Sequence, residues 1–154
     1  MKYLIWILLL TLFSCNKEKT TYASGFWVNS TSHYIEVRPV SKGLVVSQNI
    51  LRLMPGQKLQ VGGASFRGIL DHQLFDNEYF SDADSVLVIY DSTFVVSHYF
   101  VTPSSVRPKH HLRLSPRNII NQANYDFKYE DDSKHKRQTF STYTFTEQDY
   151  LDAK

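Results

Sequence analysis

The chain has 154 residues, which predicts one domain of ordinary size and excludes a multidomain enzyme. Hydrophobic residues make up 42% of the sequence and charged residues 21%, a balance that is typical of a folded globular protein. Lys and Arg number 17 against 15 for Asp and Glu, which gives a net charge of +2 without a long basic run. We therefore expect no nucleic-acid partner.

The N-terminus has the pattern of an export signal. Lys2 precedes an apolar stretch over residues 3–13 that is interrupted only by Thr11. A transmembrane helix needs about 20 apolar residues, whereas a signal peptide needs about 7 to 15 behind a positive charge. The stretch is too short for a membrane-spanning helix, and it predicts a signal peptide over residues 1–14.

Cys15 is the single cysteine of the chain and cannot form an intramolecular disulfide. Residues 12–15, Leu-Phe-Ser-Cys, resemble the lipobox of bacterial lipoproteins. The resemblance implies that the signal peptide is cleaved before Cys15 and that Cys15 carries fatty acyl chains such as palmitate. Because two or three chains anchor a protein stably, the membrane is then a partner through the lipid alone.

The same resemblance implies a location. Asn16 is not the aspartate that retains lipoproteins of enteric type at the inner membrane, so we expect attachment to the outer membrane, facing the periplasm or the cell surface. The polar residues that follow predict a lipidated cysteine and flexible tether over residues 15–22. A single β-rich domain is expected over residues 23–154.

From Gly25 onward, apolar residues alternate with a period of two, which predicts β-strands. Pro39 is expected to end or edge its strand, and Gly62-Gly63 to follow one. The expected strands cover residues 25–29, 34–38, 44–53, 58–61, 65–70, 85–90, 93–99, 125–130 and 139–145.

The strands over residues 85–90 and 93–99 form the clearest pair. Only Asp91 and Ser92 separate them, so an antiparallel hairpin is predicted. Alternation assigns Val86 and Val88 to one face and Leu87 to the other, so both faces are apolar. A strand of this kind is covered on both sides, and we expect the hairpin at the centre of a sheet.

Short helices are expected near the C-terminus. Ser115-Pro116 favours a helical turn over residues 116–122, and Thr146-x-x-Asp149 favours a capped helix over 147–152. The predicted fold is therefore an all-β domain, an antiparallel β-sandwich or barrel-like structure, with short helical pieces. The segments 29–35 and 143–150 look similar to those of small uncharacterised lipoproteins of Gram-negative bacteria, a resemblance that implies no activity.

Two sets of residues are considered as metal ligands. The six histidines lack the spacing of a zinc site, the adjacent His110 and His111 point to opposite faces of a strand, and His98 is expected to be solvated. One segment is acidic and contains Asp76, Glu78, Asp82 and Asp84. It is interpreted either as an irregular calcium site with these four residues as candidate ligands or as a solvated loop. No cofactor is predicted.

Four aromatic residues flank loops and are candidates for stacking on sugar rings, although such residues also belong to cores: Tyr79, Phe80, Tyr99 and Phe100.

Catalytic motifs such as Gly-x-Ser-x-Gly and Ser-x-x-Lys are lacking, and a lipidated Cys15 offers no thiol. We therefore expect a binding or interaction module, with a glycan as one candidate ligand. The alternative is a structural or assembly subunit of an envelope complex, and a hydrolase is less favoured.

Overall fold

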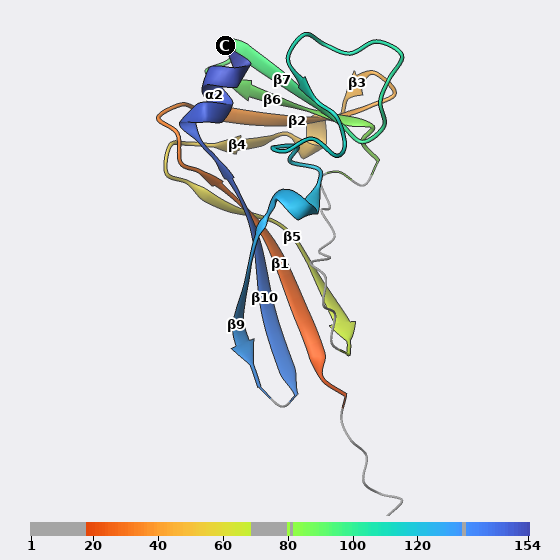
Figure 1. Ribbon diagram of the computed structural model, residues 1–154, viewed down its shortest axis with the longest axis vertical. Helices are drawn as coiled ribbons and strands as arrows, with labels where there is room; N and C mark the ends of the chain where they lie inside the picture. The colour runs from red at the N-terminus through yellow and green to blue at the C-terminus, as the bar shows by residue number, and fades with distance from the viewer. Residues whose placement is uncertain (1–17, 69–79, 81, 134) are drawn as a thin grey trace, which may run out of the picture.

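Two β-sheets contain the ten strands of the computed structural model, which describes residues 18–68, 80, 82–133 and 135–154. Sheet A has the strand order β5-β1-β10-β9, and sheet B has the order β3-β2-β6-β7-β8, with β4 also paired to β2 (Figure 1). The all-β class is confirmed, and the described strands form two open sheets in a sandwich-like arrangement rather than one closed barrel. The strands are β1 (Thr20–Asn29), β2 (Ile35–Ser41), β3 (Leu44–Val45), β4 (Leu51–Leu53), β5 (Lys58–Arg67), β6 (Ser85–Tyr90), β7 (Phe94–Tyr99), β8 (His110–His111), β9 (Asp126–Asp132) and β10 (Lys136–Phe145).

Both sheets are mixed: most neighbouring strands are antiparallel, as expected, but each sheet also contains one parallel pair. Strand β1 pairs in parallel with β10 over its whole length, from Thr20 opposite Lys136 to Asn29 opposite Phe145. Strand β7 pairs in parallel with β8. An alternating pattern reports which side chains are buried, and it is the same for either strand direction.

Strand β1 begins at Thr20, inside the segment 15–22 that was predicted to be a flexible tether. Residues 20–22 pair with β5 on one side and with β10 on the other. The Thr21 side chain is buried, and its hydroxyl donates to the Gly68 carbonyl at 2.9 Å. Polar composition misled the prediction because threonine favours strands as strongly as apolar residues do.

The core lies between sheet B and the half of sheet A that lies next to it (Figure 1). Trp27 of β1 is fully buried, with its ring 5.4 Å from Phe80 and 6.2 Å from Phe145. Ile35 and Val37 from β2 face it from sheet B and are also fully buried. Each such side chain contributes about 1.5–3 kcal/mol through burial, so this cluster holds the two sheets together.

The predicted hairpin is confirmed. Strands β6 and β7 are antiparallel, and β6 lies between β2 and β7 near the middle of sheet B. Residues 91–93 connect the strands, one residue more than expected, and Asp91 and Ser92 have φ values of 48° and 59°, a left-handed backbone that matches the twist of a hairpin. Val88 is fully buried.

Pro39 and Gly62-Gly63 lie inside strands rather than at their ends, although Pro39 occupies a locally unpaired edge. Pro39 lies inside β2, where its missing N–H falls between the partners β4 and β3, and its carbonyl accepts from Val46 N at 2.9 Å. Gly62 and Gly63 lie inside β5, which joins the strands expected at 58–61 and 65–70. They lie opposite β1 next to a β-bulge at Gly25, where an added Cβ on Gly63 would lie 3.4 Å from the Ala23 carbonyl.

The C-terminal helix is confirmed as α2 (Glu147–Ala153), whereas the helical turn expected over residues 116–122 is wrong. That segment forms successive turns followed by the 3₁₀-helix η3 (Gln122–Asn124). Arg117 has a φ of 71°, which an α-helix does not allow. A further 3₁₀-helix, η1 (Ser47–Asn49), divides the run expected as one strand over 44–53 into β3 and β4.

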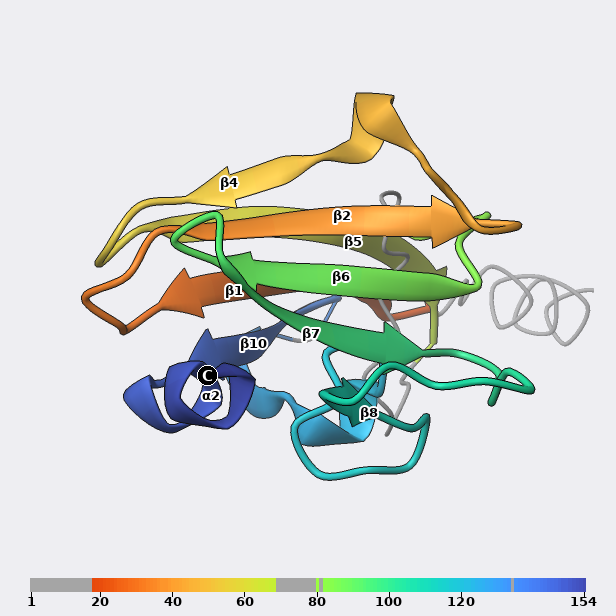
Figure 2. The same cartoon turned by 90° about the horizontal axis from the view of Figure 1, so that it is seen from above.

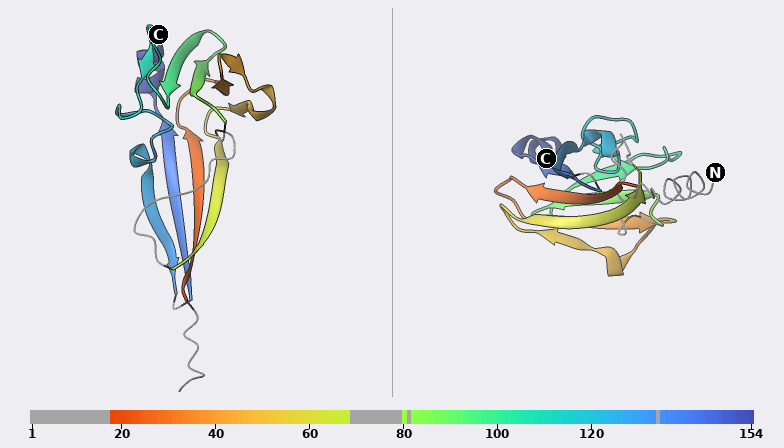
Figure 3. Two further views of the ribbon diagram at one scale, coloured as in Figure 1. Left: turned by 90° about the vertical axis from the view of Figure 1, so that its right-hand side faces the viewer. Right: turned by 90° about the horizontal axis from the view of Figure 1, so that it is seen from below.

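The strands of sheet A continue well beyond sheet B. Thr20 lies at the free tip of this four-stranded extension, and the chain end that follows α2 lies at the opposite end of the molecule (Figures 1 and 3). Seen from above, α2 lies beside the end of β10 and close to β7 (Figure 2). No described helix has the length and apolar character needed to cross a membrane.

Candidate ligand pocket

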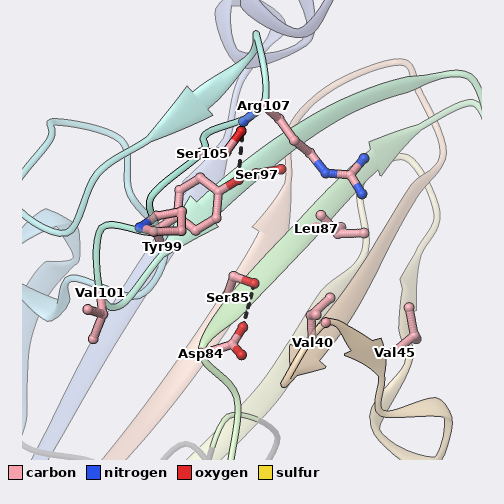
Figure 4. A pocket seen from close by; sticks show the side chains of 12 residues that line it. Val40, Val45, Asp84, Ser85, Leu87, Ser97, Tyr99, Val101, Ser105 and Arg107 are labelled. Carbon is pink, nitrogen blue, oxygen red and sulfur yellow. Dashed lines mark hydrogen bonds between the residues drawn. The ribbon is translucent and has the colours of Figure 1, made fainter.

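A cavity of about 440 Å³ lies on the face of sheet B that points away from sheet A (Figure 4). Alternation along the strands places Val40 of β2, Leu87 of β6 and Ser97 of β7 on this face. The inward face of β6 carries Val86 and Val88, which belong to the core. Residues 101–107 form one wall and the turn between β2 and β3 forms another, so the second apolar face of β6 is the floor of a pocket.

One end of the pocket is rich in hydrogen-bond donors. Ser97 is fully buried, and its hydroxyl has no hydrogen-bond partner in the described part of the chain. The Tyr99 hydroxyl accepts from the Arg107 backbone N–H at 3.3 Å. The Arg107 side chain is exposed, and it forms no ion pair with any described residue. These groups can donate hydrogen bonds to a ligand.

The other end of the pocket carries a carboxylate. Asp84 accepts from the Ser85 hydroxyl at 2.8 Å and from the backbone N–H of Lys42 at 2.7 Å. Asp84 and Asp82 are both exposed, and the other two calcium candidates, Asp76 and Glu78, lie outside the described residues. Within the described ranges, no group of three or more His, Cys, Asp or Glu side chains is arranged to hold a metal ion.

The structure separates the aromatic candidates. Tyr99 lines the pocket, but its side chain is 9% exposed. Phe80 packs against Trp27 in the core, which is the alternative role that the sequence left open for it, and Phe100 packs edge-on against Phe80 at 6.1 Å. Tyr79 and the lipidation candidate Cys15 lie outside the described residues. The three described candidates, Phe80, Tyr99 and Phe100, thus form no exposed stacking platform.

His98 is buried rather than solvated, because it shares the inward face of β7 with Val96. Its Nδ1 accepts from the Ile119 backbone N–H at 3.2 Å, and its ring lies 4.9 Å from that of His111. Burial, with a smaller effect from His111, holds the pKa of His98 well below its ordinary value of 6.5. His110 and His111 lie on opposite faces of β8, as predicted.

A second polar cluster joins the segment 112–124 to α2. The Arg117 guanidinium contacts the buried Asp149 carboxylate and donates to the Thr144 carbonyl at 2.6 Å, and the Tyr143 hydroxyl donates to the Arg117 carbonyl at 2.8 Å. The cavity beside it holds only about 10 Å³, which is too small for a ligand. These residues are positioned to stabilise the fold.

A third cluster surrounds His33. Its Nδ1 lies 2.5 Å from the Asp91 carboxylate, its Nε2 lies 3.5 Å from Glu147, and its ring stacks on Tyr150 at 3.5 Å. Both carboxylates are largely exposed, so the ion pairs are screened by water. The cluster connects two turns to α2.

Comparison of the chain with known protein families, curated proteins and solved structures finds no match. Function is therefore inferred from the geometry of the chain alone.

Proposed function

We propose that this protein is a lipid-anchored binding module whose pocket on sheet B takes a small ligand. The single observation that carries the proposal is the buried Ser97 hydroxyl, which has no described partner and lines a pocket beside Arg107. A buried hydroxyl without a partner costs about 1–3 kcal/mol, and a bound ligand that accepts from it would offset this cost. The volume of the pocket falls within the usual range for small-molecule sites.

The position of the pocket supports the proposed anchor. Strand β1 is ten residues long, which corresponds to about 33 Å, and it begins at the tip of sheet A remote from sheet B. Acyl chains on Cys15 would therefore tether the protein at this tip. Sheet A would act as a stalk that holds the pocket away from the bilayer.

A blocked pocket tests the binding function. We would record thermal shifts of the full chain against a library of sugars, amino acids and short peptides. Leu87→Trp places an indole in the pocket, and the control Ser24→Trp places one on the outer face of sheet A. Compounds should stabilise the wild type and Ser24→Trp but not Leu87→Trp. Equal shifts for all three proteins, or none, would overturn the proposal.

The anchor is tested separately by labelling cells with a palmitate analogue. Wild-type protein should incorporate the label and Cys15→Ala should not. Equal incorporation into both proteins would exclude Cys15 as the site of lipidation.

A further inference from the structure

Resting on the proposed binding function, we propose that the pocket binds a short peptide by its two charged termini, with the carboxylate at Arg107 and the ammonium at Asp84. Figure 4 shows the Arg107 side chain reaching over the pocket floor at one end and Asp84 at the other. The two ends of the pocket thus carry opposite charges.

The end of the pocket at Arg107 suits a carboxylate. Arg107 offers a planar guanidinium with several N–H donors, a geometry that matches a carboxylate with two parallel hydrogen bonds. The Ser97 hydroxyl has no described partner. The Tyr99 hydroxyl accepts from the Arg107 backbone N–H, so the proton of the Tyr99 hydroxyl can be donated to a ligand oxygen. These three donors line the same end of the pocket, and an anion is the strongest acceptor that they could share.

The end of the pocket at Asp84 suits an ammonium group. Each carboxylate oxygen of Asp84 accepts one hydrogen bond, from Ser85 or from Lys42, and each can accept a second. Both bonds hold the carboxylate in place before a ligand arrives. Because Asp84 is exposed, its attraction for a cation is screened, and we expect it to contribute less to affinity than Arg107.

The spacing of the two ends fits an extended peptide. Leu87 pairs with Ser97 at the end of the pocket near Arg107. Asp84 precedes Leu87 by three residues, which corresponds to about 10 Å at the rise of an extended strand. Three extended peptide residues span about the same distance. A tripeptide therefore has about the length that separates these two positions of the pocket.

The middle of the pocket is apolar. Val40 and Leu87 form the floor, and Val45 and Val101 on the two rims are 42% and 71% exposed. Burying such side chains against aliphatic ligand groups is favourable by about 25 cal/mol per Å². An aliphatic peptide provides these groups between its charged ends, whereas a neutral sugar provides hydroxyls that would lie against valine and leucine.

Calorimetric titration of the full chain with Ala-Leu-Ala tests the proposal. The C-terminal amide of this peptide should bind about tenfold more weakly or worse, and the N-acetylated peptide a few-fold more weakly. In Arg107→Gln the free acid and the amide should bind equally, and in Asp84→Asn the free amine and the acetylated peptide should bind equally. The control Arg113→Gln removes an exposed cation that does not line the pocket and should leave both preferences unchanged.

The outcomes distinguish this proposal from the binding function on which it rests. If the amide binds as tightly as the acid, or if Arg107→Gln keeps the preference for the acid, the peptide proposal is overturned. If Ala-Leu-Ala does not bind but a sugar binds and Leu87→Trp blocks it, the peptide proposal fails and the binding function stands. If no compound shows binding that Leu87→Trp blocks, both fail.

Discussion

The Asp149 carboxylate lies against the Arg117 guanidinium, with Oδ1 2.7 Å from Nε and Oδ2 in contact with Nη2. Thr146 is the residue immediately before α2, and its backbone N–H donates to the same Oδ2 at 2.7 Å. One carboxylate therefore caps the helix and fixes the segment that contains Arg117. It also accounts for the left-handed backbone at Arg117, which a non-glycine residue adopts only when its surroundings hold it there.

Asp149→Ala should lower the free energy of unfolding by about 2–4 kcal/mol, because it removes the cap and leaves Arg117 without its carboxylate. Urea denaturation followed by circular dichroism measures this loss. Asp152→Ala is the matched control, since Asp152 is exposed and accepts a hydrogen bond from Gln148 of the same helix rather than from another segment of the described chain. An equal loss in the two variants would show that the contact with Arg117 contributes nothing.

Val88→Asp should abolish folding, because an unpaired carboxylate in the core costs several kcal/mol out of the ~5–15 kcal/mol that holds a domain together. Phe94→Asp should melt well below the wild type, since Phe94 is half-buried with its ring 5.6 Å from Tyr150. Asp91→Asn keeps an acceptor for the Tyr34 backbone N–H and should melt within a few degrees of wild type. Thermal melts compare the three proteins, and a native-like melt of Val88→Asp would contradict the central position of the hairpin.

Tyr125→Phe should cost about 1–3 kcal/mol although it removes a single oxygen atom. The Tyr125 hydroxyl accepts from Trp27 Nε1 at 2.9 Å and donates to the Ile119 carbonyl at 2.7 Å, and all three groups are buried. The substitution leaves two polar groups without partners. Tyr129→Phe is the control, because Tyr129 is half exposed; comparable losses by urea denaturation would argue against the importance of the buried network.

Acid should destabilise the protein through His98. Burial lowers the pKa of His98 and, to a smaller degree, that of His111 below 6.5, so the unfolded chain binds more protons than the folded one below this pH. Stability is then complete above about pH 6.5 and falls as the pH decreases toward the folded pKa values. His98→Asn cannot ionise, and its loss of stability between pH 7.5 and 5.5 should be smaller by about 1 kcal/mol. His135→Asn, at an exposed position, should show the wild-type slope; a wild-type slope in His98→Asn would refute the assignment.

Much of the fold could be predicted from alternation, but strand direction and pairing could not. The strand over 139–145 is recognised because its burial alternates, whether its neighbour is parallel or antiparallel. Likewise, the inward position of His98 could be read from its period-two relation to Val96, but its polarity suggested a solvated face. The hydrogen bond from Ile119 that permits its burial comes from a distant segment, which no local pattern reveals.

The candidate pocket could be predicted only in part. The two apolar faces of residues 85–90 indicated that another part of the molecule covers the second face. In the structure, residues 101–107 lie beside that face and form a wall of the pocket. The role proposed for Arg107 depends on how this segment folds back, and only the three-dimensional structure shows that the Ser97 hydroxyl has no partner among the described residues. The lipidation of Cys15 stays a prediction.

The parallel pairing of β1 with β10 also determines when the protein can fold. Thr20 and Lys136, which pair with each other, are separated by almost the entire described chain, so the central pair of sheet A closes a very long loop. Contacts of such high sequence separation slow folding, because the loop entropy is lost before the strands gain their hydrogen bonds. A chain emerging from a ribosome or a translocation pore would hold β1 without its central partner until β10 had also emerged. Sheet A is thus completed only when synthesis or transport of the domain is nearly finished, although β1 can pair with β5 earlier.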